Sequence, residues 1–568
     1  MGDTASQLLD ALTEMRTVIS GAHFPLAVPS GREAEAAAER LTKQLDDYLL
    51  PRLGRLDAPL LVVVGGSTGA GKSTLVNSIV RAPVSAAGVL RPTTRAPVLV
   101  SHPDDVAWFA ERRVLPGLTR TNAARADQAS LRVIAAPVLT PGLALLDAPD
   151  IDSVVDENRE LAAQLLAAAD LWLFVTTAAR YADAVPWHVL RTARDRGTVL
   201  SLVLDRVPLG ADEEVAAHLR EMLAAQRLGE VEMFILPEVD LGESGLIPEL
   251  LVAPLHGHLD RLAGDAAARS EVIRTTLDGA IRSLVSDLDA LALAAEEQGR
   301  AWDVLDEAVT KAYAEADHNI ANALAGGALL RGEVLARWQE FVGTGDLMRA
   351  LQASIGRLRD RVVTGVTGRP PPGRQLQDAL TSGVATLIEA QATEAGERAA
   401  AAWAATSAGA GLASPTLAQP RSDLRERCER LVRDWQRCVL DLVAQQGAQK
   451  RRLARITAYS VNATGLLVMI AVFASTAFIP TGAEIAVAGG TTLTAQKLLE
   501  AVFGDEALRR LARDAREDLL VRVQALLEVE AARFGDARAA ISLDPTLPER
   551  LRRSSHAIAQ LGPVGSAR

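Results

Sequence analysis

The residues best suited to chemistry form a glycine-rich loop. Residues 66–74 have the sequence GSTGAGKST, which matches the spacing G-x-x-x-x-G-K-S. This spacing predicts a phosphate-binding loop, because glycines let backbone N–H groups turn inward around an anion. We expect Lys72 to reach the β- and γ-phosphates of a nucleoside triphosphate and Ser73 to ligate Mg²⁺. The residues expected to bind the nucleotide here are Gly66, Ser67, Thr68, Gly69, Ala70, Gly71, Lys72, Ser73 and Thr74.

The segments on either side of this loop have the patterns needed to position it. Residues 60–66, LLVVVGG, form an apolar run typical of a buried strand, and residues 74–80 have helical spacing. Strand, loop and helix in this order are the context that such a loop requires. The helix N-terminus adds positive potential at the phosphates. The pattern therefore predicts nucleotide binding but does not select the base.

A second motif follows another apolar run. Residues 143–153, LALLDAPDIDS, end a predicted strand with Asp147, which we expect to hold the Mg²⁺ ion through water. Asp150 stands where a P-loop GTPase has a glycine, and its backbone N–H is expected to meet the γ-phosphate. Its carboxylate would then face a strongly negative group, which disfavours binding unless the carboxylate turns away or holds a cation.

Two further stretches complete the predicted site. In residues 90–100, LRPTTRAPVLV, Thr93 and Thr94 are candidates for a second Mg²⁺ ligand, and Thr94 is preferred. Arg95 is a candidate arginine finger acting within the same chain, with a solvent-facing arginine as the alternative. Thr68 is expected to orient the attacking water.

The loop predicted to contact the base contains Asp205, Arg206, Val207 and Pro208. Arg206 is expected to lie over the base, and Asp205 to contact it from one edge. Pro208 stands where a guanine-reading loop has a carboxylate, and proline cannot accept the guanine N–H groups.

The chain divides by pattern into five segments. Residues 58–258 alternate apolar strands with amphipathic helices, which predicts an α/β domain with a mostly parallel sheet. Residues 259–456 are predicted to be a helical stalk, and residues 1–57 to be helices that join it. Residues 457–503 are predicted to form an apolar hairpin that interacts with the membrane. Residues 504–568 are expected to be a returning helix and a loose tail.

The apolar segment 457–503 is the candidate membrane contact. Residues 456–483 carry no charged side chain and follow the basic stretch KRRLAR at 450–455. About 20 apolar residues are enough for a helix to cross the hydrocarbon core, and a basic flank is typical of the cytoplasmic side. The alternative is a buried hairpin in a large helical bundle. We expect contact with membrane lipid at the cytoplasmic face of the cell membrane.

Composition excludes several other classes. The formal net charge of −11 argues against a general nucleic-acid binder, so no nucleic-acid partner is expected. The two cysteines, Cys428 and Cys438, match no zinc or redox spacing and indicate a reducing compartment. No N-terminal signal peptide is visible.

Residues 94–98, TRAPV, resemble the switch of the dynamin superfamily of large GTPases. The order of the segments also resembles that of bacterial dynamin-like proteins, in which a GTPase domain precedes a helical bundle, a membrane-binding paddle and a returning helix. The resemblance implies GTP as substrate, with ATP as an open alternative, and pairing of heads in a homo-oligomer. It also implies that a second, related chain is a possible partner. The family places a polar pair where this chain has Thr68 and Gly69, so slow hydrolysis is expected.

Two hypotheses from different classes follow. The first is a dynamin-like nucleoside triphosphatase that couples pairing of its heads to membrane binding, tethering or remodelling. The second is a nucleotide-dependent, membrane-associated scaffold with weak or no hydrolysis, which Asp150, Pro208 and Gly69 favour.

Overall fold

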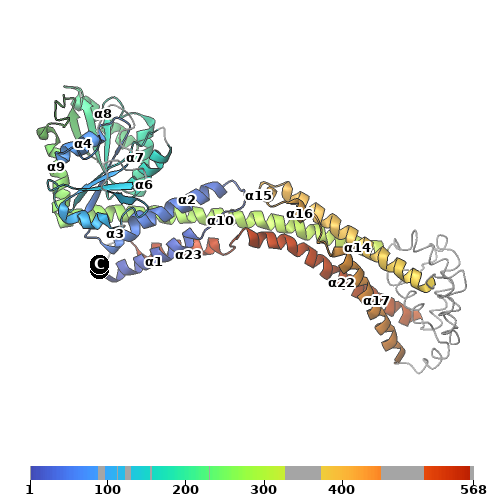
Figure 1. The fold of residues 1–568 in the computed structure, drawn as a ribbon. Helices are drawn as coiled ribbons and strands as arrows, with labels where there is room; N and C mark the ends of the chain where they lie inside the picture. Colours follow the sequence, from blue (N-terminus) through green and yellow to red (C-terminus); the bar gives the residue numbers. More distant parts are fainter. Residues whose placement is uncertain are drawn as a thin grey trace, which may run out of the picture. The chain divides into compact units, whose positions relative to one another are not determined.

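The computed structural model describes residues 2–86, 96–111, 113–121, 130–153, 156–228, 231–325, 372–448 and 505–562. The chain forms two compact units (Figure 1). The first contains Met1–Phe24, Ser30–Glu297 and Asp544–Arg568, and the second contains Pro25–Pro29 and Gln298–Leu543.

The first unit is built on an eight-stranded sheet with the order β3-β4-β2-β5-β1-β6-β7-β8. All neighbouring strands are parallel except β2 and β5, which are antiparallel. This arrangement confirms the predicted α/β domain with a mostly parallel sheet. The strands are β1 (Leu60–Gly66), β2 (Val98–Ser101), β3 (Thr119–Thr121), β4 (Ser130–Ala135), β5 (Leu143–Asp147), β6 (Leu171–Thr177), β7 (Val199–Val207) and β8 (Glu232–Pro237).

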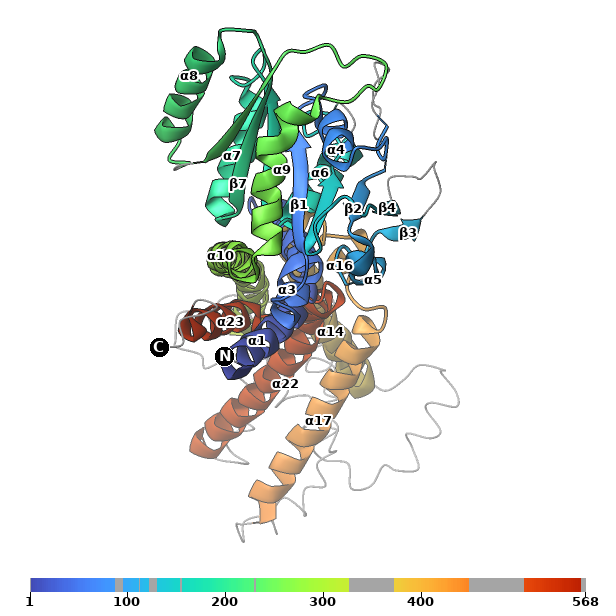
Figure 2. The ribbon, with the colours of Figure 1, turned by 90° about the vertical axis from the view of Figure 1, so that its left-hand side faces the viewer.

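Helices bury both faces of the sheet, which explains why its central strands are apolar without alternation. Leu60, Val62 and Val64 of β1 enter one core, and Leu61 and Val63 enter the other. The first core includes α4 (Lys72–Val80) and α9 (Glu249–Gly264), which lie beside β1 in Figure 2. The second core includes α6 (Asp156–Ala167), α7 (Ala184–Arg196) and α8 (Asp212–Ala225). A 3₁₀ turn (Pro103–Asp105) and α5 (Val106–Ala110) follow β2.

Several helices outside the sheet share the first core. They are α1 (Gly2–Ser20), α2 (Gly31–Gln44), a π-helical turn (Leu45–Leu49), α3 (Leu50–Gly54), the beginning of α10 (Ala266–Ala325) and α23 (Leu547–Leu561). The expectation of a loose tail is wrong for α23, because Leu547, Leu551 and Ile558 are buried in this core. Ser555 on the same face donates a hydrogen bond to Asp289 of α10.

The described part of the second unit is mostly helical, in agreement with the predicted helical region. It contains α10 from Gln298 onward, α14 (Pro372–Ala404), α15 (Ser407–Ala410), α16 (Pro415–Ala418), α17 (Leu424–Ala448) and α22 (Asp505–Ala540). Trp302 and Trp403 meet edge to face with ring centroids 5.6 Å apart. The buried indole of Trp403 donates to the Leu305 carbonyl at 2.9 Å, and that of Trp435 donates to the Ala515 carbonyl at 2.7 Å. These bonds satisfy the polar ends of the largest side chains in the core.

The apolar segment 457–503 and the basic stretch before it lie outside the described residues. Among the helices that the structure describes, none combines the length and the apolar character required to cross a bilayer.

Candidate nucleotide-binding site

The glycine loop connects β1 to α4 at the carboxyl edge of the parallel strands (Figure 2). Ligands of open α/β sheets bind at this edge. Gly66 has φ +156°, and a Cβ there would lie 2.1 Å from the carbonyl oxygen of Val175 on β6. Gly71 has φ +93°, and a Cβ there would lie 2.5 Å from Asp205 Oδ2. Glycine is therefore required at both ends of the loop.

Lys72 is turned back onto its own loop. Its Nζ donates to the carbonyl oxygens of Gly66 at 2.9 Å and Ser67 at 3.1 Å, and to Asp150 Oδ1 at 2.5 Å. The side chain of Lys72 is 5% exposed and that of Asp150 is 22% exposed. The lysine expected to bind phosphate is therefore paired with the carboxylate of Asp150, the residue that stands where a P-loop GTPase has a glycine.

Asp147 is fully buried at the end of β5. Its Oδ2 accepts hydrogen bonds from Ser73 at 2.6 Å and from Ser85 at 2.5 Å. Its Oδ1 has no hydrogen-bond partner among the described residues. Burial raises the pKa of Asp147, and the bonds from Ser73 and Ser85 oppose this rise. Asp147 and Ser73 are thus hydrogen-bonded to each other, with one buried carboxylate oxygen available to a further donor.

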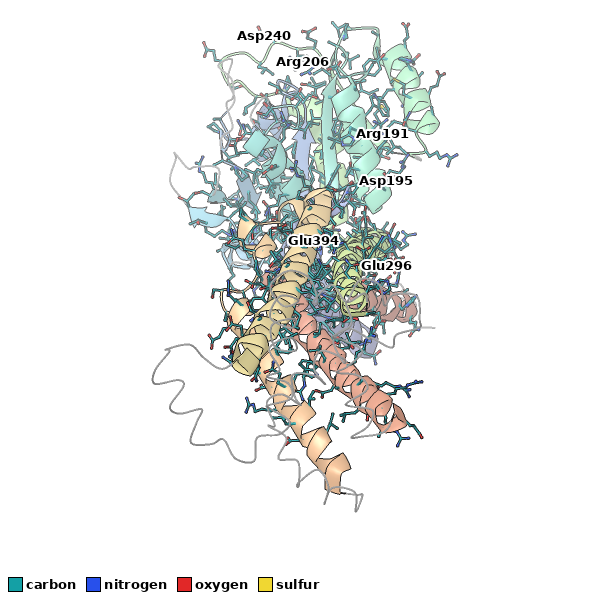
Figure 3. All side chains as sticks on the ribbon, turned by 90° about the vertical axis from the view of Figure 1, so that its right-hand side faces the viewer. Arg191, Asp195, Arg206, Asp240, Glu296 and Glu394 are labelled. Carbon is teal, nitrogen blue, oxygen red and sulfur yellow. The ribbon has the colours of Figure 1, made fainter. Side chains whose placement is uncertain are left out.

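The predicted base loop reaches the glycine loop. Arg206, labelled in Figure 3, donates through Nη2 to the carbonyl oxygen of Gly69. Asp205 Oδ2 lies 3.6 Å from Arg206 Nε and borders Gly71. Burial raises the pKa of Asp205, whereas the Arg206 N–H and charge lower it. In this structure both residues contact the loop that would hold the phosphates.

The remaining predicted residues divide into two groups. Ser67 has a buried hydroxyl without a partner among the described residues, Ala70 is buried, and the carbonyl of Thr74 accepts a bond from Ser78. Thr93, Thr94 and Arg95 lie outside the described residues. Their roles stay predictions.

Three contacts at Thr68 were not foreseen from the sequence. Its backbone N–H and hydroxyl donate to Asp152 Oδ1 at 2.5 and 2.7 Å. Arg180 Nη1 donates to the Thr68 carbonyl, and Arg180 Nη2 donates to Asp152 Oδ2, both at 2.9 Å. Arg180 also donates through Nε to Asp183 at 2.8 Å. The sequence did contain a signal for these residues: Asp152 and Arg180 each come shortly after the carboxyl end of an apolar, buried strand.

Comparison with known proteins gives structural but not sequence matches. No family model matches the chain, and no curated protein matches it. Two solved structures described as an oligomerised bacterial dynamin pair, which senses and tethers membranes over long range, are similar to it. One has 13% sequence identity and a TM-score of 0.42, with 95% of this chain and 96% of that chain covered. The other has 11% identity and a TM-score of 0.41, with 96% and 95% covered.

Proposed function

We propose that this chain is a dynamin-like nucleoside triphosphatase, with GTP as the substrate that its switch sequence favours and ATP as the alternative. The observation that carries the proposal is the meeting of three residues where β1 and β5 end. There the loop contributes Lys72 and Ser73, and the neighbouring strand contributes Asp147. A lysine for the phosphates, with a hydroxyl and a carboxylate for the metal, is a set of groups suited to a triphosphate bound with Mg²⁺.

The residues present fit Mg²⁺. Ser73 would ligate the ion, Asp147 would hold it through water, and Thr94 would be the second ligand. Hard cations prefer oxygen ligands, and Asp147 Oδ1 is a buried carboxylate oxygen without a partner among the described residues. When bound, the ion neutralises charge on the phosphates. Lys72 would add its own charge after leaving Asp150, and Thr68 and Arg95 are the candidates for orienting water and stabilising the transition state.

Nucleotide binding would be coupled to the membrane. Pairing of two heads in a homo-oligomer would move the helical region, and the apolar segment 457–503 would insert into lipid at the cytoplasmic face of the membrane. The support is the sequence itself: an uncharged stretch, 456–483, directly after four basic residues in 450–455. A second, related chain is a candidate partner. The action on the membrane would be binding, tethering or remodelling.

Phosphate release tests the proposal. The full-length protein is incubated with Mg·GTP or Mg·ATP, with and without liposomes that contain anionic lipid. We expect slow release, faster with GTP, and stimulation by the liposomes. A variant lacking residues 457–496 should release phosphate at the basal rate and should not float with the liposomes. No release above a Lys72→Ala control with either nucleotide would contradict the proposal.

The second candidate function is a nucleotide-dependent scaffold with weak or no hydrolysis. Asp150 favours it, because its carboxylate competes with phosphate for Lys72 and adds negative charge where hydrolysis needs charge neutralisation. The same experiment separates the two functions. A scaffold would bind nucleotide and liposomes without release of phosphate.

A further inference from the structure

Three loops that are far apart in the sequence meet at Thr68. In the sheet, β1 lies between β5 and β6, so the loops that follow these strands are neighbours. Asp152 comes from the loop after β5, Thr68 from the loop after β1, and Arg180 from the turn after β6. Arg180 is held in that turn by its own N–H, which donates to the Thr177 carbonyl at 3.0 Å.

The two carboxylates after β5 have different cationic partners. Asp150 is paired with Lys72, and Asp152 is paired with Arg180. In the proposed function, Lys72 must leave Asp150 in order to bind phosphate. Arg180 need not move to bind phosphate, because its three nitrogens already donate to Asp183, the Thr68 carbonyl and Asp152. The Arg180–Asp152 pair can therefore persist when the nucleotide binds.

We infer that Arg180 is a positioning residue of the nucleotide site, which neutralises Asp152 and holds it on Thr68 so that the phosphate loop can accept a triphosphate. This inference rests on the proposed function. Asp152 Oδ1 lies 2.5 Å from the backbone nitrogen of Thr68, within the loop that would surround the phosphates. An unneutralised carboxylate at this place would repel the polyanion, and it would also be free to leave Thr68.

The charges at Asp152 agree with this assignment. Burial raises the pKa of Asp152, but the hydrogen bonds from Thr68 and the Arg180 guanidinium outweigh burial, so that the pKa is lowered overall. The carboxylate is 12% exposed and the guanidinium 39% exposed. Asp152 is therefore a charged group near the phosphates, and Arg180 is the cation paired with it.

Binding of Mg·GTP and Mg·ATP to four proteins tests the inference: the wild type, Arg180→Ala, Asp152→Asn and the double variant. Arg180→Ala should weaken binding about ten-fold, the effect expected when a partly exposed charged pair near an anion is broken. Asp152→Asn should bind at least as tightly as the wild type. In the double variant the repulsive charge is gone, and affinity should return to within about three-fold of the wild type.

The recovery separates electrostatic positioning from a simple structural role. If the Arg180–Asp152 pair only stabilised the conformation of the loop, the double variant would bind nucleotide as weakly as Arg180→Ala, and the inference would be overturned. Arg180→Lys keeps the charge but cannot make all three bonds, so it should bind nucleotide more tightly than Arg180→Ala and no more tightly than the wild type. The matched control is Arg194→Ala, which removes a partly exposed arginine of α7 that is paired with Asp195 and should leave affinity unchanged.

Three further outcomes are decisive. If thermal unfolding shows that Arg180→Ala does not fold, Asp152→Asn and Arg180→Lys carry the test, and weaker binding by Asp152→Asn overturns the inference. If the wild type binds neither nucleotide, the proposed function is refuted and this inference with it. If the wild type binds and Arg180→Ala binds equally well, the inference alone is refuted.

Discussion

Asp150→Asn should tighten nucleotide binding while it weakens the protein without nucleotide. Asp150 Oδ1 lies 2.5 Å from Lys72 Nζ, and the lysine side chain is only 5% exposed. To bind phosphate, Lys72 must exchange this carboxylate for the nucleotide. The Asp150 charge then remains close to the triphosphate without its partner. The wild-type affinity therefore includes the cost of breaking the pair and the repulsion that follows.

The hydrogen bond between Lys72 and Asp150 determines how much the nucleotide affinity should change. A hydrogen bond between charged groups contributes about 1.5–3 kcal/mol, and asparagine keeps the shape of the side chain without its charge. Removing this competition should raise nucleotide affinity about ten- to hundred-fold, since 1.4 kcal/mol corresponds to a factor of ten. Without nucleotide, Lys72 keeps its bonds to the Gly66 and Ser67 carbonyls. The free energy of unfolding should nevertheless fall by about 1–2 kcal/mol.

Isothermal titration with Mg·GTP and Mg·ATP measures the affinity, and urea unfolding measures the stability. The control is Asp195→Asn, which removes the same charge from an exposed position on α7, labelled in Figure 3. It should change neither quantity. Reduced stability of Asp150→Asn with unchanged or weaker nucleotide binding would refute the exchange of Lys72 between Asp150 and phosphate.

Three other substitutions test separate parts of the first unit. Burial raises the pKa of Asp47 to about 6, although Gln164 donates a hydrogen bond to it. The folded protein therefore holds this proton more tightly than the unfolded chain, and the free energy of unfolding falls as pH rises from about 4 to 6. In urea unfolding, Asp47→Asn should become more stable relative to the wild type by up to about 2 kcal/mol between pH 4.5 and pH 7.5. Arg52→Ala should cost about 3–5 kcal/mol in the same assay, because it leaves the fully buried Asp170 without its cation, and a loss below 1 kcal/mol would contradict this. Pro208→Asp should increase GTP-over-ATP discrimination about ten-fold or more in competition titrations, and an unchanged ratio would show that this position does not face the base.

Much of the fold could be predicted from apolar patterns. Residues 60–64 and 171–175 are continuous apolar runs, and they lie in β1 and β6 at the centre of the sheet. The strands β3 and β4 were not foreseen, because β3 is the short polar segment TRT and β4 has Arg132 in its middle. Helix α23 was missed because its apolar positions are spaced among arginines and serines, and only packing in the first core shows their common face.

The site was predictable where its residues are close in sequence or follow a known spacing. Lys72, Ser73 and Asp147 were proposed as site residues in this way. Asp152 and Arg180 were not, because their meeting depends on the strand order that places β1 between β5 and β6. The ion pair between Lys72 and Asp150 also could not be predicted from the sequence. The sequence showed that a carboxylate occupies an unusual position, but not that Lys72 is its partner.

Nucleotide binding by the full-length protein and by Lys72→Ala tests whether residues 66–74 form a phosphate-binding loop. The wild type should bind Mg·GTP or Mg·ATP, and the variant should bind at least about ten-fold more weakly, since it loses a charged hydrogen bond to phosphate worth about 1.5–3 kcal/mol. Circular dichroism should show that the variant remains folded. Equal affinity of the two proteins, or no binding by the wild type, would contradict the assignment of residues 66–74 as the phosphate-binding loop.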